Sequence, residues 1–173
     1  DHARDLVRAF LKHNKYDIKI MDVNWGETPR DALHPMGDIE IINCILPSPE
    51  VERQPDVYVD IRIPNEFQTY GKFNIGITAG IETTAVSNAW IEGCNKMDLI
   101  IVPSEHSKEG FVKALYEKMQ NLPNGQQQKV GELKLEKPIE VVFEGADEDV
   151  YKPIDDVSLD LVDDVKEDFV FLH

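Results

Sequence analysis

The sequence has little of what marks the specialised classes of protein. Its 173 residues include only two cysteines, Cys44 and Cys94, which are too few for a disulfide framework or for a structural zinc site with about four Cys or His ligands. No apolar run approaches the roughly 20 residues that a membrane-spanning helix needs, and no signal peptide is evident. We therefore expect no membrane span, no structural metal and a cytoplasmic setting.

Positive charge is also scarce. The chain has 18 Lys and Arg residues and 33 Asp and Glu residues, so its formal net charge at pH 7 is −15. Proteins that bind nucleic acid depend on clusters of Lys and Arg that neutralise phosphates, so this composition argues against a nucleic-acid partner. It also disfavours docking on anionic membranes. The apolar content of 42% is that of a folded chain and not of a disordered one.

The apolar pattern predicts strands that alternate with helices. Helices are expected at residues 1–13, 87–97 and 105–119, where apolar side chains recur at helical spacing. Strands are expected at residues 17–23, 39–46, 55–63, 73–79, 98–102 and 138–143, and a solvated loop is expected at 121–131. Such an order predicts an α/β fold whose sheet is mostly parallel and has helices on its faces.

The domain organisation follows from a change in composition near residue 145. We expect one α/β domain over residues 1–145 and an acidic linker over 146–167, where Asp and Glu dominate. Residues 168–173, which include Phe169 to Leu172, have the pattern of a strand. Because the chain opens on a helix and closes on a strand, we expect it to be a piece of a larger protein.

Polar residues follow three of the expected strands, at the edge where open parallel sheets bind ligands. They are Asn65 and Glu66 after the third strand, Thr78, Gly80 and Glu82 after the fourth, and Ser104, His106 and Ser107 after the fifth. Simpler roles stay open for three of them. Ser104 could only cap a helix, Glu82 could accept bonds from nearby backbone, and His106 could only be solvated. No catalytic triad, P-loop or dinucleotide fingerprint is present.

Two stretches resemble retaining-type glycosyltransferases of the GT-B fold. The first covers residues 71–108 and reads GKFNIGITAGIET, then Trp90–Ile91, then MDLIIVPS. In that family a strand ends in a Thr-containing turn and a Glu, a Trp-containing helix follows, and the next strand ends in Val-Pro-Ser. The second stretch, VVFEGAD followed by YKP, is similar to the crossover into the second domain of the family.

The resemblance implies a fold, an activity and partners. The fold would be a Rossmann-like, mostly parallel sheet with helices on both faces, as in the N-terminal half of a two-domain GT-B enzyme. The activity would be transfer of a sugar from a nucleotide-sugar donor to a sugar or other hydroxyl acceptor, without a further cofactor. The second domain, which holds the donor, would be missing here except for its truncated first strand at residues 168–173, so this piece is expected to be inactive alone. Asp147 would fix the crossover, and no catalytic base is assigned.

Other classes of function are compatible with the same residues. The chain could be a non-catalytic α/β binding or assembly module that keeps the fold, which the strong acidity would suit equally well. A flavodoxin-like nucleotide or flavin binder is a weaker option, because it needs a phosphate-binding turn after the first strand that the sequence does not contain.

Overall fold

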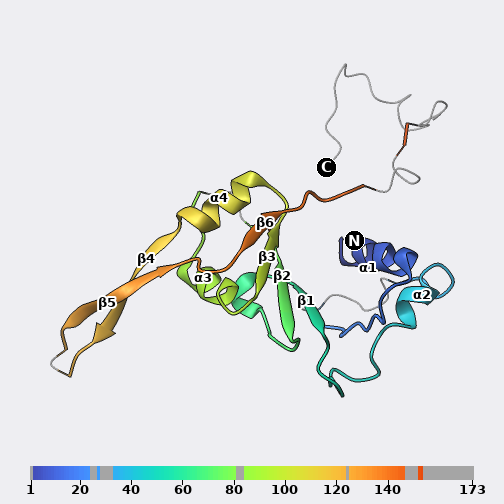
Figure 1. Cartoon of the computed structure of the whole chain (residues 1–173), viewed down its shortest axis with the longest axis horizontal. Coiled ribbons are helices and arrows are strands. Elements are labelled where there is room, and N and C mark those ends of the chain that lie inside the picture. Colours follow the sequence, from blue (N-terminus) through green and yellow to red (C-terminus); the bar gives the residue numbers. More distant parts are fainter. Residues whose placement is uncertain are drawn as a thin grey trace.

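The computed structural model describes residues 2–23, 27, 33–80, 84–123, 125–146 and 152–153 (Figure 1). Before the main sheet come the helices α1 (His2–His13) and α2 (Ile39–Ile42). The central part contains β1 (Val57–Ile61), the 3-10 helix η1 (Pro64–Glu66), β2 (Phe73–Ile77), α3 (Asn88–Cys94), β3 (Leu99–Val102) and α4 (Glu105–Lys113). The strands β4 (Leu115–Asn121), β5 (Gln127–Lys134) and β6 (Ile139–Val141) follow.

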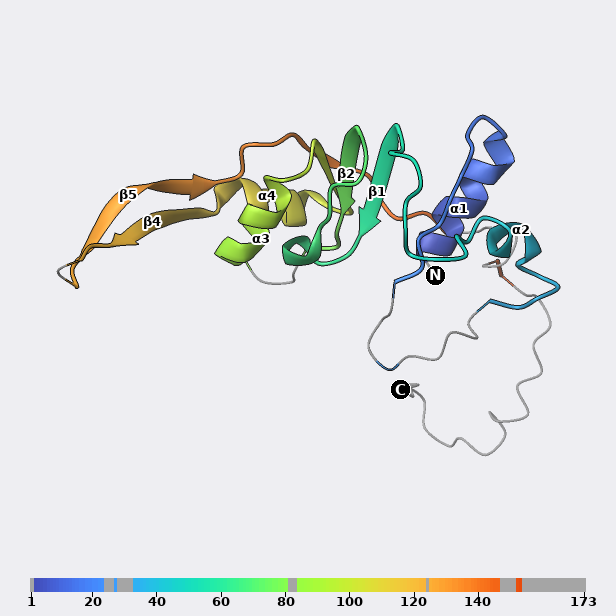
Figure 2. The ribbon, with the colours of Figure 1, turned by 90° about the horizontal axis from the view of Figure 1, so that it is seen from below.

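The fold is mixed α/β, with one parallel and one antiparallel sheet. The parallel sheet has four strands in the order β1-β2-β3-β6, so each strand lies beside the next strand of this sheet in the chain. Strands β4 and β5 pair antiparallel and form a long hairpin that projects from the body (Figures 1 and 2). The prediction of an α/β fold with a mostly parallel sheet is therefore confirmed.

The buried core lies on one face of the parallel sheet. Ile100 and Val102 of β3 meet Ile91 and Cys94 of α3 and Phe111 of α4 there. The aromatic ring of Phe67, which follows η1, is 1% exposed, and a Cβ added at Gly76 of β2 would lie 2.5 Å from that ring. These contacts place η1, α3 and α4 on the same face of the sheet.

The topology explains why these three elements share a face. Every connection from β1 to β6 advances in the same direction across the sheet. Parallel crossovers are right-handed in almost all proteins, so connections that advance in one direction lie on one side. The expectation of helices on both faces is not met among the described elements from β1 to β6, because the sequence does not reveal the order of the strands.

Serine caps start the two crossover helices where the sequence predicted them. The Ser87 hydroxyl accepts a hydrogen bond from the backbone N–H of Trp90 at the start of α3. The Ser104 hydroxyl accepts one from Ser107 at the start of α4. Such caps satisfy one of the free N–H groups of a helix terminus and are typically worth about 1 kcal/mol.

Three predicted elements were wrong. Residues 39–46 are not a strand, since Ile39–Ile42 form the single turn α2, held by a bond from the Ile42 N–H to the Asp38 carbonyl. The helix predicted to reach residue 119 ends at Lys113, because Ala114 is extended and β4 begins. The loop predicted at 121–131 is largely the hairpin turn and the first half of β5.

Three further expectations are met only in part or fall largely outside the described residues. The strand expected at 17–23 forms only an isolated parallel bridge between Ile20 and Ile45. The acidic linker is described only at residues 146, 152 and 153, and residues 168–173 lie outside the described residues.

Candidate functional site

The candidate site is the edge of the parallel sheet at which all four strands end. Because the strands are parallel, the segments that follow β1, β2, β3 and β6 all leave the sheet on this edge. Open α/β sheets bind their ligands there. The structure therefore gathers at one edge the polar segments that the sequence pointed to.

Two serines hold the ends of β2 and β3 together. The Ser107 hydroxyl donates to the carbonyl oxygen of Ala79 at 2.8 Å and accepts from the Ser104 hydroxyl at 3.1 Å. Ser104 in turn accepts from the Ser107 N–H at 3.1 Å. Ser107 is buried, so its hydroxyl fixes the position of the β2 turn against the first turn of α4.

Gly80 completes this contact. Its φ of +81° is in the left-handed region that favours glycine, and a Cβ there would lie 2.8 Å from the Ser107 Oγ. Thr78, two residues earlier, is buried and its N–H donates to the Ile101 carbonyl at 3.1 Å. The structure thus brings Thr78, Gly80, Ser104 and Ser107 together. The contact of Ser107 with the β2 turn could not be seen from spacing.

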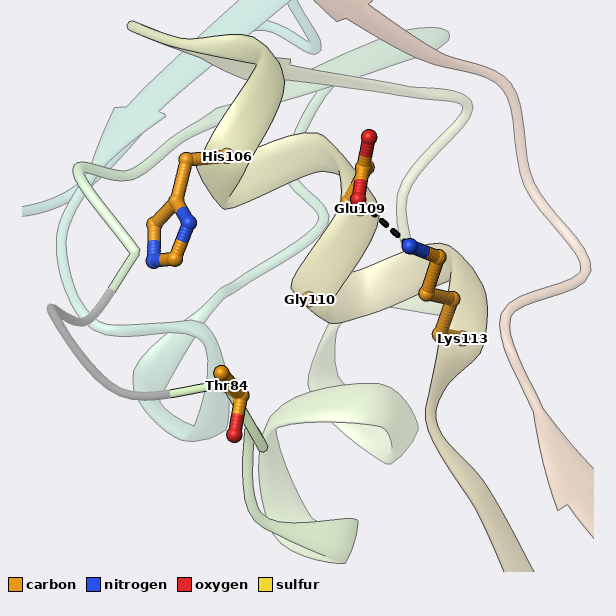
Figure 3. A pocket seen from close by; sticks show the side chains of 5 residues that line it. All are labelled: Thr84, His106, Glu109, Gly110 and Lys113. Carbon is orange, nitrogen blue, oxygen red and sulfur yellow. Dashed lines mark hydrogen bonds and ion pairs between the residues drawn. The ribbon is translucent and has the colours of Figure 1, made fainter.

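His106 precedes Ser107 on the first turn of α4, and its side chain is exposed. It lines a shallow cavity of about 90 Å³ together with Thr84, Glu109, Gly110 and Lys113 (Figure 3). Residues 106, 109, 110 and 113 share one face of α4 because they are three, four and seven positions apart. That spacing could have identified Glu109 and Lys113 from the sequence.

The charges at this cavity are largely paired. The Lys113 ammonium lies 2.5 Å from a carboxylate oxygen of Glu109 (Figure 3). The hydrogen bond from Lys113 is the main cause that holds the pKa of the Glu109 carboxyl below its usual range. The electrostatic effect of His106 acts in the same direction. The cavity therefore offers a hydroxyl, an imidazole and an ion pair, which suits a small polar group.

Asn65 and Glu66 lie on a different part of the edge. Both are exposed in η1, which packs against α3 so closely that a Cβ at Gly93 would lie 1.8 Å from the Pro64 carbonyl oxygen. Since β2 separates β1 from β3, about 10 Å of sheet lies between η1 and the start of α4. Glu82 and Asp147 lie outside the described residues.

One polar cluster near this edge was missed by sequence reasoning. Arg62 donates to both carboxylate oxygens of Asp60, each at 2.7 Å, and the Gln68 N–H donates to the same carboxylate at 2.9 Å. Asp60 is 4% exposed, so this bidentate ion pair satisfies a carboxylate that is buried within the fold. The hydrogen bond to Asp60 raises the pKa of Arg62, and burial raises the pKa of the neighbouring Tyr58 to about 12.

The orientation of β1 explains the omission. The alternation of Val57, Val59 and Ile61 with polar residues predicts that the apolar residues face the core. The structure instead turns Asp60 toward the helices and leaves Val57 53% exposed. A strand whose polar side is buried gives no sequence signal for its buried ion pair.

Within the described ranges, no three His, Cys, Asp or Glu side chains converge as metal ligands would. The described helices also include none long and apolar enough to cross a membrane. No protein-family model matches the chain, and neither the curated proteins nor the solved structures compared with it gave a match.

Proposed function

We propose that the chain is the acceptor-side half of a glycosyltransferase that moves a sugar from a nucleotide-sugar to a hydroxyl group. The fold in this proposal is the Rossmann-like N-terminal domain of a GT-B enzyme. The observation that supports it best is the Ser104–Ser107–Ala79 hydrogen-bond chain, which fixes two strand-end segments at the ligand-binding edge of a parallel sheet. The resemblance of residues 71–108 supplies the class of substrate.

The cavity on α4 is too small to hold a nucleotide-sugar by itself. Pockets for ligands of the size of a nucleotide-sugar usually enclose about 300–1,000 Å³. The cavity on α4 has about 90 Å³, which is enough for one hydroxymethyl group or a few waters. The proposal therefore needs a second wall, and in a GT-B enzyme the C-terminal domain provides it and binds the donor diphosphate.

The proposed residues divide into two roles. Ser107 and Thr78 are buried, and Ser107 already uses its hydroxyl as donor and acceptor, so they position the edge. The exposed residues His106, Asn65 and Glu66 are the groups that would contact substrate hydroxyls, with Ser104 and Gly80 shaping the surface between them. Glu82 is included in the contacting set from the sequence alone.

A thermal-shift screen of nucleotide-sugars on the full-length protein tests this proposal. A ligand at 100 times its dissociation constant stabilises a protein by about 2.7 kcal/mol, so one donor should raise the melting temperature by several degrees. The variant His106→Ala should weaken the response to acceptor sugars in the presence of that donor. The matched control is His13→Ala, which removes an exposed histidine at the end of α1 and should leave the response unchanged.

A non-catalytic binding or assembly module is the second candidate. The observation that favours it is the apolar face of the parallel sheet opposite α3 and α4, on which Val57 and Phe73 are exposed and which the strand-end site does not use. A full-length protein that melts cooperatively but responds to no nucleotide-sugar would exclude the transferase and leave this candidate.

A further inference from the structure

The face of the parallel sheet that points away from α3 and α4 is apolar throughout its first three strands. The strand register places on it the alternate residues of β1 from Val57 to Ile61 and of β2 from Phe73 to Ile77. Leu99 and Ile101 of β3 continue the same surface, which we call the open face. None of these side chains is buried, and Val57 and Phe73 are 53% and 43% exposed.

An open face of this kind requires a cover. Parallel sheets are covered on both faces in almost all known proteins, and their strands are correspondingly apolar. Every residue of the open face is Val, Ile, Leu or Phe up to Glu140 of β6, which pairs with Ile101 at the far edge. Because the crossovers from β1 to β6 all lie on the other side, the cover comes from residues before β1, from residues after β6 or from another molecule.

The dimensions of the open face match one helix. Four strands at about 4.8 Å spacing are roughly 14 Å across, and five residues of strand are roughly 17 Å long. A helix of 12 residues is about 18 Å long and about 10 Å thick, so it would cover most of this area. A stable dimer buries about 800 Å² on each partner, which is more than this face provides.

Helix α1 has the properties of that cover. It has 12 residues, it precedes β1 in the chain, and none of its residues is buried. Leu6, Val7, Phe10 and Leu11 form an apolar stripe at helical spacing that is only half-buried beside α2. An amphipathic helix of this kind is stabilised mainly when its apolar stripe packs against other apolar side chains.

The position of α1 favours it as well. Its first turn already lies beside the segment that follows β6, where His2 Nδ1 is 3.9 Å from Glu144 Oε1. A helix with its N-terminus at this edge would run opposite to the strands, as α3 and α4 do.

We propose that α1 docks its Leu6–Val7–Phe10–Leu11 stripe on the open face and so forms the second helical layer of the sheet. In the structure, α1 and α2 lie on the far side of β1 from α3 and α4 (Figures 1 and 2). Residues 47–56 join them to β1 with neither helix nor strand and contain three prolines. Docking needs rotation of the α1–α2 unit about this segment.

Thiol cross-linking of the full chain tests the docking. The variant Leu6→Cys/Ile75→Cys, in a Cys44→Ser background, should be joined within one chain by a short bismaleimide. The matched control Ala9→Cys/Ile75→Cys carries its thiol on the exposed side of α1 and should not be joined. A cross-link between two chains would assign the cover to a second copy, and equal yields for the two variants would exclude oriented docking; either result overturns the proposal.

A second measurement leaves the sheet unaltered. Leu6→Asp should undock the helix and increase the fluorescence of a dye that binds apolar surface several-fold, whereas Ala9→Asp should not change it. Circular dichroism of both variants establishes that the rest of the chain stays folded. No difference in dye binding between two folded variants would contradict the proposal.

Discussion

At the residue scale, two glycines in helices have opposite environments. A Cβ at Gly93 of α3 would lie 1.8 Å from the Pro64 carbonyl oxygen, and because this atom belongs to the backbone it cannot move aside alone. A Cβ at Gly110 of α4 would lie 3.8 Å from Val86 Cγ1, which is ordinary contact. The same substitution therefore tests close packing at one site and helix propensity at the other.

We expect Gly93→Ala to destabilise the protein by about 3 kcal/mol, since α3 and η1 must separate. Gly110→Ala should stabilise it by up to about 1 kcal/mol, because alanine is the better helix former. Urea denaturation of both variants measures the difference. Equal midpoints would show that α3 and η1 are not packed as described.

The two cysteines should differ in reactivity. Cys94 is fully buried, and burial raises the pKa of its thiol to about 12, so almost no thiolate forms at neutral pH. In the variant Cys44→Ser, a thiol reagent should label the remaining cysteine only at urea concentrations that unfold the protein. Fast labelling in native buffer would contradict the buried position of Cys94.

At the scale of elements, the sequence predicted those helices and strands whose formation depends on residues close together in the chain. The caps Ser87 and Ser104 and the apolar run 99–102 are local signals, and α3, α4 and β3 formed where these signals lie. The β4–β5 hairpin depends on distant contacts instead. Its second strand is polar and only Leu133 enters the core, so periodicity gave no signal. The turn residues Pro123 and Gly125, with φ of +79° at Gly125, were the available indication.

The hairpin should depend on its base for stability. Leu133 is 6% exposed, and Asn95 binds the segment directly after it, donating to the Lys134 carbonyl and accepting from the Glu136 N–H. Leu133→Ala should cost about 2–3 kcal/mol through the cavity it leaves. It should also speed amide hydrogen exchange along β4 and β5, because an isolated two-stranded hairpin is marginal in water.

Val130→Ala is the matched control for the hairpin, since Val130 is 55% exposed near the bulge of the same strand. Its effect should stay within about 0.5 kcal/mol, as for most surface substitutions. If the two substitutions had equal effects, the hairpin would not be held by the core contact of Leu133.

At the scale of the whole molecule, the sequence predicted the parallel α/β sheet but not its one-sidedness. Strand order decides which face each crossover covers, and no residue of this chain encodes that order locally. The same limit applies to the candidate site. The strand-end residues could be named from the sequence, but the bond from Ser107 to Ala79 joins segments 28 positions apart and follows only from the pairing of β2 with β3.

The acid stability of the molecule should depend on a few hydrogen-bonded carboxylates. Asp98 accepts from the Asn74 backbone N–H at 2.8 Å and from its side-chain amide at 3.2 Å, and these bonds lower the pKa of Asp98 below 3.8. Hydrogen bonds from neighbouring groups likewise lower the pKa values of Asp38, Asp56 and Glu109. A carboxyl with a lowered folded pKa contributes stability that is complete above its unfolded pKa and is lost as pH falls through the folded value.

The free energy of unfolding should therefore fall as pH drops below about 4, where the unfolded chain takes up protons first. Asp98→Asn should lower stability at pH 6 and should reduce the further loss between pH 6 and pH 3, because this proton linkage is removed. Asp17→Asn, at a carboxylate 86% exposed and 3.0 Å from Lys19, is the control and should change neither value appreciably. Chemical denaturation of the three proteins at both pH values measures the linkage. An acid-induced loss of the same size in Asp98→Asn and the parent would mean that the Asn74–Asp98 bonds do not hold β2 to the start of β3 in solution.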